Sequence, residues 1–458
     1  MTIESVGAFT VRGGDFSQSA QTITQVGTGR FAVAWQDGGS LASIVQGEIF
    51  TSGGQSTNAF TVRGTGDNAQ NVPTITQVGT DRFAVAWRDR GDSDNNIQGQ
   101  VFTSGGQSTG SFTARDAEGN RQTSPTITQV GTDRFAVAWE SGFDPAAIQG
   151  EVFTSGGQST GSFTVSGAGD NSQRFPTITQ VGADRFAVVW DEDGGFRSPG
   201  IVRGELFTDS GQSTGSFTVR GTGDEQQDKS TITQVGTDRF AVAWEDGAFG
   251  EAVIQGEVFT NGGQSTGSFT VRGPGDSDQR SPTITQVGTD RFAVAWRDGP
   301  FNEAVIQGEV FTNGGQSTGS FTVSGDGFHR SPKITQLDQD RFTVAWSDFS
   351  LNPIQGEVFE FSANELPSAA PDSASTIASE AVSIDVLAND SDPDDDALSI
   401  DDPGSPANGA VAVIGGGEIR YTPDAGFTGT DSFSYTISDG NGGTAQADVS
   451  ITVEPANQ

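Results

Sequence analysis

Short apolar runs recur along most of this chain, and within them large and small side chains alternate. In residues 82–87, for example, Phe83, Val85 and Trp87 alternate with alanines, so one face is bulky and the other is flat. A period of two predicts β-strands, and the repeated segments lack the 3.6-residue apolar period of an amphipathic helix. Around this tryptophan the pattern predicts four strands, over residues 74–78, 82–87, 97–102 and 111–114.

The same pattern occurs seven times. Each copy contains one tryptophan, and the spacing between successive tryptophans is 50 to 54 residues. Four strands in about 50 residues is the size of one β-propeller blade. In a ring, the bulky face of one blade would pack on the flat face of the next. The copies are marked by Trp35, Trp87, Trp139, Trp190, Trp244, Trp296 and Trp346.

The ends of the repeated region predict how the ring closes. Residues 8–11 match the fourth strand of a unit but precede the first complete unit, and the last unit stops after its third strand, at Phe359. All seven blades have four strands if the N-terminal strand serves as the fourth strand of the last blade. Such closure would remove exposed sheet edges. We therefore expect residues 1–362 to form a seven-bladed β-propeller closed by its N-terminal strand.

A second, different domain follows the repeats. Residues 363–376 are rich in Pro, Ala and Ser and are predicted to be a linker of limited flexibility. Beyond them, alternating runs separated by turn signals predict a small β-sandwich of the Ig-like or cadherin-like kind over residues 377–458. The predicted fold class is all-β. The predicted strands cover residues 383–387, 409–414, 418–422, 432–438 and 447–453.

The charge of the chain limits the classes of partner that it can bind. The net charge is −35, and from residue 363 onward 17 acidic residues face a single basic one, Arg420. Such a surface repels nucleic acid and anionic membranes, so we expect neither as a partner. No stretch of 18 apolar residues predicts membrane insertion. The absence of cysteine excludes disulfides and thiolate chemistry and is compatible with export.

The repeats resemble those of very large secreted or surface proteins of Gram-negative bacteria, many of them exported by type I secretion, as in RTX-like adhesins. The resemblance rests on P-T-I-T-Q-V-G-T-D-R-F-A-V-A-W at residues 125–139 followed by I-Q-G-E-V-F at 148–153. Residues 385–396 and 420–443 resemble the cadherin-like or Ig-like modules of the same proteins. The resemblance implies a bacterial extracellular or cell-surface adhesive or matrix protein, often calcium-dependent.

One face of the predicted propeller carries all the variation between the copies. If the four strands of a unit are called a to d in chain order, the b–c and d–a loops vary in length and content, whereas the a–b and c–d turns hardly change. We therefore expect ligand contact on the variable face. Five b–c loops carry a phenylalanine that could form an aromatic platform for a sugar or a protein surface. Alternatively, each ring folds back over its own blade. These candidates are Phe143, Phe196, Phe249, Phe301 and Phe349.

Calcium is the expected cofactor. Asp390, Asp392, Asp394 and Asp396 alternate within seven residues and offer hard oxygen ligands at a density that favours a cation. The resemblance adds Asp439, in the turn S-D-G-N-G-G, as a further candidate. A solvated acidic loop without a cation is the alternative.

Together these patterns predict a non-enzymatic extracellular protein for adhesion, matrix or surface assembly. Catalysis needs one asymmetric set of matched groups, but the propeller has no tyrosine and only one histidine, His329. Two alternatives remain: a lectin that binds glycans on the variable face, and a self-assembling filament or surface-layer subunit. The expected partner is an extracellular glycan or a surface protein, or a second copy of the chain.

Overall fold

A computed structural model gives the fold. The chain divides into two compact units, Ile3–Phe361 and Ser362–Gln458. Within the described residues there is no helix, and so none that could span a membrane. The structure describes residues 3–11, 18–38, 43–62, 69–90, 95–114, 120–142, 145–165, 171–192, 200–219, 227–247, 251–271, 278–300, 304–323, 329–348, 353–361, 365–393, 396–415, 417–440 and 443–456.

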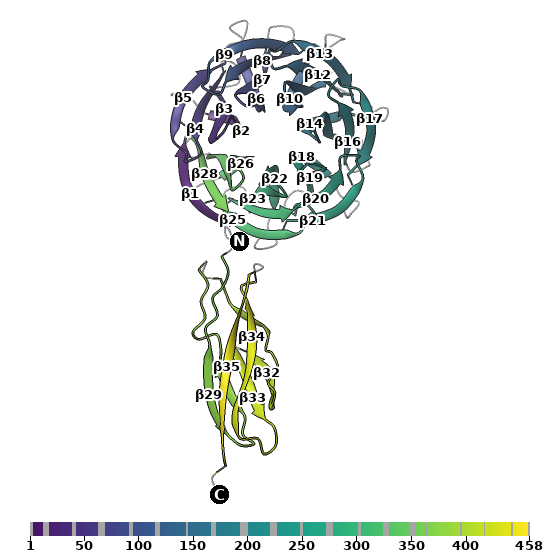
Figure 1. Ribbon diagram of the computed structural model, residues 1–458. Helices are drawn as coiled ribbons and strands as arrows, with labels where there is room; N and C mark the ends of the chain where they lie inside the picture. Colours follow the sequence, from purple (N-terminus) through teal and green to yellow (C-terminus); the bar gives the residue numbers. More distant parts are fainter. Residues whose placement is uncertain are drawn as a thin grey trace. The chain divides into compact units, whose positions relative to one another are not determined.

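The first unit is a ring of seven four-stranded antiparallel sheets (Figure 1). We number these blades 1 to 7 along the chain and call the strands of each blade a to d, from the centre outward. Blades 1 to 3 consist of β2 (Gln18–Gln25), β3 (Arg30–Asp37), β4 (Ile44–Thr51) and β5 (Ser56–Thr61); β6 (Ala69–Val78), β7 (Arg82–Arg90), β8 (Asn95–Thr103) and β9 (Ser108–Ala114); and β10 (Gln122–Val130), β11 (Arg134–Ser141), β12 (Ala147–Thr154) and β13 (Ser159–Thr164).

The remaining four blades repeat the same order. The prediction of a seven-bladed all-β propeller is confirmed. Blades 4 to 7 consist of β14 (Gln173–Gln180), β15 (Arg185–Glu192), β16 (Ile201–Thr208) and β17 (Ser213–Thr218); β18 (Gln227–Val235), β19 (Arg239–Asp246), β20 (Val253–Thr260) and β21 (Ser265–Thr270); β22 (Gln279–Val287), β23 (Arg291–Asp298), β24 (Val305–Thr312) and β25 (Ser317–Thr322); and β26 (His329–Gln336), β27 (Arg341–Asp348) and β28 (Ile354–Phe361) with β1 (Ile3–Thr10).

The ring closes through its N-terminal strand, as predicted. Strand β1 pairs antiparallel with β28 and is the outer strand of blade 7. In this register Phe9 lies opposite Gly356, just as the strand-d phenylalanine of every other blade lies opposite the strand-c glycine. The first and the last strand of the propeller, β1 and β28, therefore belong to the same sheet.

Neighbouring blades pack bulky face on flat face. The small Ala84 and Ala86 of blade 2 lie in one buried cluster with Phe135, Val137 and Trp139 of blade 3. The corresponding clusters repeat around the ring, and every tryptophan is at most 3% exposed. The tryptophans, which lie on the bulky faces of the predicted strands, are therefore core residues. They are not available as a surface platform for sugars.

A glycine and three phenylalanines form the contact that recurs at each blade interface. In blade 4, a Cβ on Gly204 would lie 2.1 Å from the ring of Phe217, so the absence of a side chain makes room for that ring. Phe217 then reaches Phe240 and Phe259 of blade 5, with ring centroids 5.2 and 5.0 Å away. At the closure, Phe9 covers Gly356 and meets two phenylalanines of blade 1 in the same way.

The second unit consists of two sheets, in the orders β29-β35-β34-β31 and β30-β33-β32. The predicted runs are all strands, but the predicted linker over residues 363–376 is too long. Residues 372–377 form β29, which pairs in parallel with β35, and Ser368 bridges Ser391. The prolines and serines of this segment are typical of a linker, so the sequence did not predict this edge strand. The strands are β29 (Asp372–Ile377), β30 (Val382–Asp385), β31 (Ser399–Asp402), β32 (Gly409–Gly415), β33 (Glu418–Pro423), β34 (Gly429–Ser438) and β35 (Thr444–Glu454).

The closing contact can be tested by removing one ring. We expect Phe9→Ala to lower the free energy of unfolding by about 3–5 kcal/mol, as for other buried phenylalanines. It should also release β1 from β28, because β1 has no covalent link to blade 7. Phe217→Ala is the matched control, since its strand follows directly from its own blade. Hydrogen exchange should show local opening of β28 in Phe9→Ala only, and equal protection in the two variants would contradict this closure.

Candidate functional site

Each of the seven central strands contains a β-bulge near its start. In β14, Arg174 pairs with Asp191 and Thr177 with Val189, so the central strand has one extra residue at this point. The bulged residue has a positive φ of 49° to 55° in every blade. Bulges redirect side chains and are common beside functional sites. These seven bulge residues are Ala20, Val72, Ser124, Phe175, Lys229, Ser281 and Ser331.

A positive φ is unfavourable for residues other than glycine, and most of all for a β-branched residue such as Val72. Carboxylates of the preceding blade hold three of the bulges in place. The backbone N–H groups of Phe175, Lys229 and Ser281 donate to carboxylates at 2.8, 2.7 and 2.6 Å. The strain is thus balanced by strong hydrogen bonds to charged groups. The respective acceptors are Glu140, Asp191 and Glu245.

The bulge residues surround a pocket of about 490 Å³ on the axis of the ring, which we call the mouth pocket. Strands a of blades 2 to 7 contribute to its walls, beside the d–a loops. The pocket therefore lies at the face that the sequence predicts to be variable. Its lining combines prolines, hydroxyls, one aromatic ring and two ammonium groups: Val72, Ser124, Pro125, Phe175, Pro176, Thr177, Lys229, Ser230, Thr231, Ser281, Pro282, Ser331, Pro332 and Lys333.

A side pocket of about 230 Å³ adjoins the mouth pocket and shares Ser124 and Phe175 with it. The side chain of Phe175 is 54% exposed. A solvent-facing ring between two pockets is a suitable surface for an apolar ligand face. The charged residues that line the side pocket are Arg88, Arg121, Arg174 and Glu140.

The two lysines of the mouth pocket differ in their surroundings. The Lys229 ammonium lies 3.4 Å from Glu245, which also accepts a hydrogen bond from Arg280 at 2.9 Å. No ion pair or side-chain hydrogen bond joins Lys333 to another described residue. The Lys333 side chain is accessible from the pocket, but the blades around it exclude much of the bulk water, and this desolvation lowers its pKa.

Asp191 is the buried acid behind the bulge of Lys229. Burial is the largest effect and raises its pKa to about 7. Hydrogen bonds from the Ser230 hydroxyl and from the N–H groups of Lys229 and Ser230 oppose this increase, while repulsion from Asp228 adds to it. Asp191 is 7% exposed and does not line the mouth pocket among the described residues, so it acts as a support for the backbone.

The structure locates the predicted ligand residues only in part. All five loop phenylalanines, Phe143, Phe196, Phe249, Phe301 and Phe349, lie outside the described residues. The sequence prediction missed the bulge residues, because it began the central strand of blade 2 at residue 74, two positions after Val72. A signal was available in the sequence: this one position, shortly before T-I-T-Q (K-I-T-Q in the last copy), differs between copies far more than its neighbours downstream.

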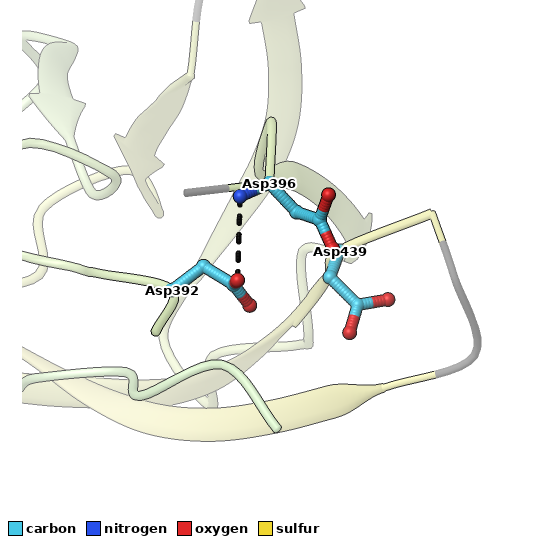
Figure 2. A group of neighbouring side chains, drawn as sticks. All are labelled: Asp392, Asp396 and Asp439. Carbon is cyan, nitrogen blue, oxygen red and sulfur yellow. Dashed lines mark hydrogen bonds between the residues drawn. The ribbon is translucent and has the colours of Figure 1, made fainter. Parts of the chain in front are cut away.

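Three of the five predicted metal ligands lie together in the second unit. Asp392 and Asp396 precede β31, and Asp439 follows β34 (Figure 2). One carboxylate oxygen of each residue lies within 4.8 Å of those of the other two. Asp439 is 3% exposed and accepts a hydrogen bond from the N–H of Gly443 at 2.9 Å. Asp394 lies outside the described residues.

Asp390 belongs to a different network. It accepts a hydrogen bond from the N–H of Ala370 at 2.8 Å, and its carboxylate lies 3.1 Å from the Tyr435 hydroxyl. The same hydroxyl contacts Asp372 at 3.1 Å. Burial, followed by the charges of Asp372 and Asp390, raises the pKa of Tyr435, so this hydroxyl remains a hydrogen-bond donor. The arrangement ties residues 370–390 to β34 and accounts for Asp390 without a cation.

Comparison with known families and structures bears mainly on the fold. Residues 364–452 match the family of bacterial Ig domains. No curated protein matches the sequence. The matched segment includes β29 and the three clustered aspartates, so the Ig-like domain begins before residue 377.

Two solved structures resemble this chain over about three quarters of its length. A protein of unknown function from Dyadobacter fermentans is 11% identical, with a TM-score of 0.50 over 79% of this chain and 99% of that one. A polysaccharide lyase named PL25-Ulvanlyase is 12% identical, with a TM-score of 0.52 over 76% of this chain and 95% of that one. The same kind of lyase is also known bound to -[GlcA(1-4)Rha3S]-. At these identities the likeness shows the fold alone.

The raised pKa of Asp191 predicts a pH dependence of stability. Because the folded protein favours the protonated acid, its contribution is complete below about pH 4 and is lost as the pH rises through about 7. Asp191→Asn keeps an oxygen for the N–H donors but does not titrate. The free energy of unfolding of the unmodified protein should therefore fall, relative to the variant, by at most about 4 kcal/mol between pH 4 and pH 8. Parallel pH profiles in tryptophan-monitored denaturation would refute this.

Proposed function

We propose that this is a non-enzymatic, extracellular adhesion or surface-assembly protein whose propeller binds a surface glycan at the mouth pocket. One observation carries the proposal: the blades repeat almost identically, yet the residues that face this pocket differ. Val72, Ser124, Phe175 and Lys229 occupy the same position in four successive blades. A purely structural ring would not need a different side chain at each step. A ligand without sevenfold symmetry, in contrast, requires different side chains around the ring.

The chemistry of the mouth pocket favours a sugar. Phe175 offers an exposed flat apolar surface, which suits the C–H face of a pyranose ring. Ser124, Ser281 and Ser331 provide hydroxyls that donate and accept hydrogen bonds around the same opening. A few polar groups in a mainly apolar concave site are typical of small-ligand binding.

The groups in the mouth pocket support binding rather than cleavage. The described lining of the mouth pocket has no histidine, tyrosine or carboxylate to act as a general acid or base. Lys333 alone is not a matched catalytic set. The polysaccharide lyases of similar fold make cleavage the alternative to be measured.

A surface location is supported by the bacterial Ig domain at residues 364–452. Domains of this kind suggest a surface or extracellular protein. The acidic surface and the absence of cysteine fit the same location. In such a protein the Ig-like unit would serve as a stalk or connector, while the propeller makes the contact.

Binding can be tested with purified neutral and acidic polysaccharides in affinity electrophoresis. We expect retardation by at least one polysaccharide without the release of new chain ends. Phe175→Ser introduces the residue that blades 3, 6 and 7 carry at this position, and it should weaken binding roughly two- to tenfold through the loss of the ring contact. Val413→Ser, at an exposed site of the Ig-like unit, is the control. Chain cleavage would replace the binding function by an enzymatic one.

We also propose that Asp392, Asp396 and Asp439 bind calcium in the Ig-like unit. Three carboxylates from two loops converge there, and oxygen ligands of this kind suit Ca²⁺. Without a cation their charges repel each other, so binding would stabilise the loops around β31 and β34. The propeller offers no comparable group of three acidic side chains among its described residues.

Calcium binding can be followed in the whole chain, because both tyrosines, Tyr421 and Tyr435, lie in the Ig-like unit and all tryptophans lie in the propeller. Saturating calcium at about 100 times Kd should stabilise the tyrosine-detected transition by about 2.7 kcal/mol and leave the tryptophan-detected one unchanged. Asp439→Asn should abolish the shift, whereas Asp448→Asn, at an exposed site, should keep it. If calcium does not stabilise the tyrosine-detected unfolding transition of the unmodified protein, the calcium site is excluded.

A further inference from the structure

The mouth pocket is basic, although the chain as a whole is strongly acidic. There are 24 basic and 59 acidic residues, and the net charge is −35. The chain contains two lysines, Lys229 and Lys333, and both line this pocket. The described lining of the pocket includes no acidic side chain. The charged side chains that line the pocket therefore have the sign opposite to that of the whole protein.

Arginines extend this basic region into the side pocket. Arg88, Arg121 and Arg174 line it together with one acid, Glu140. Burial, followed by repulsion from Arg90 and Arg121, lowers the pKa of Arg88. The guanidinium remains charged, so the lowered pKa reflects first its removal from water and then the nearby like charges of Arg90 and Arg121. A bound anion would relieve this repulsion.

Lys333 stands where the other six blades have threonine. In the sequence Q-x-x-P-T-I-T-Q the fifth position is Thr in blades 1 to 6 and Lys in blade 7. Lys333 is exposed at the pocket, and no ion pair joins its ammonium to another described residue. An exposed ammonium without an ion-pair partner can form a charge-assisted hydrogen bond to an anionic ligand group. Lys229, in contrast, is already paired with Glu245.

We propose that the mouth pocket binds an anionic saccharide through its carboxylate or sulfate group, with Lys333 as the principal anion-binding residue and Phe175 against the sugar ring. The inference rests on the proposed function, because it specifies the ligand of the same pocket. A charged sugar has one flat apolar face, several hydroxyls and an anionic group, and the pocket supplies a counterpart for each. Lys229 and the arginines of the side pocket add a favourable field around this contact.

Two matched pairs of polymers test this ligand class: polygalacturonate with its full methyl ester, and dextran sulfate with dextran. Each pair differs only in the anionic group, and the two pairs separate carboxylate from sulfate recognition. We expect calorimetric titration of the whole chain to show binding of the charged member of at least one pair and at least about tenfold weaker binding of its neutral partner. The affinity should decrease as salt concentration rises.

Lys333→Thr restores the residue of the other six blades, so the variant is expected to fold. It should weaken binding of the charged polymer about ten- to hundredfold, as for the loss of a hydrogen bond to a charged group. Lys229→Ser, which copies blades 3, 6 and 7, should have a smaller effect because Glu245 already neutralises this lysine. Adding Thr177→Lys to Lys333→Thr should recover part of the affinity, since Thr177 lines the same pocket.

The outcomes separate this inference from the function on which it rests. Equal binding of the charged and neutral polymers would overturn the anionic ligand and leave glycan binding intact. Selective binding that Lys333→Thr does not weaken would overturn the role of Lys333. Binding of poly-glutamate as tight as that of the sugars would replace the saccharide by an acidic peptide. Binding of no polysaccharide at all would overturn both proposals.

Discussion

The contact between a strand-c glycine and a strand-d phenylalanine is the constraint on which the ring depends. Because the glycine has no side chain, the ring of Phe217 occupies the space beside Gly204 and reaches the phenylalanines of the next blade. The same contact between Phe9 and Gly356 joins the two ends of the propeller. Blade interfaces built in this way are dry and closely packed, so each blade fixes the orientation of the next. The regular ring then places seven central strands around one axis.

That regularity is what makes the mouth pocket possible. Each central strand bulges at the same point, and in blades 2 to 7 the bulge residue lines the pocket. The bulge conformation is strained for Val72 or Phe175, but the packed blades and carboxylates such as Glu140 maintain it. The scaffold is therefore constant, while the identity of the bulge residue can change from blade to blade without disturbing the core. This separation allows a repetitive protein to present an asymmetric binding surface.

The fold could be predicted from the sequence to a large extent. The alternation in residues 82–87 predicted a strand with one bulky face, and the unmatched strands at both ends predicted closure by β1. The site could be predicted only in part. Asp392, Asp396 and Asp439 do come together, but Asp390 hydrogen-bonds with Tyr435 instead. Strand β29 was read as a linker because its partner β35 lies some 75 residues away in sequence, and local composition says nothing about such pairing.

The sequence by itself determined the repeat, the number of blades, the closure and the presence of a second β domain. These features follow from local alternation and from periodic spacing, both of which are written along the chain. Only the tertiary structure decided which residues face the axis. Val72, Phe175, Lys229 and Lys333 are far apart in sequence, and a one-residue bulge in each strand sets their direction. A bulge changes the face on which a side chain lies, and the ring then brings together positions from six blades into one pocket.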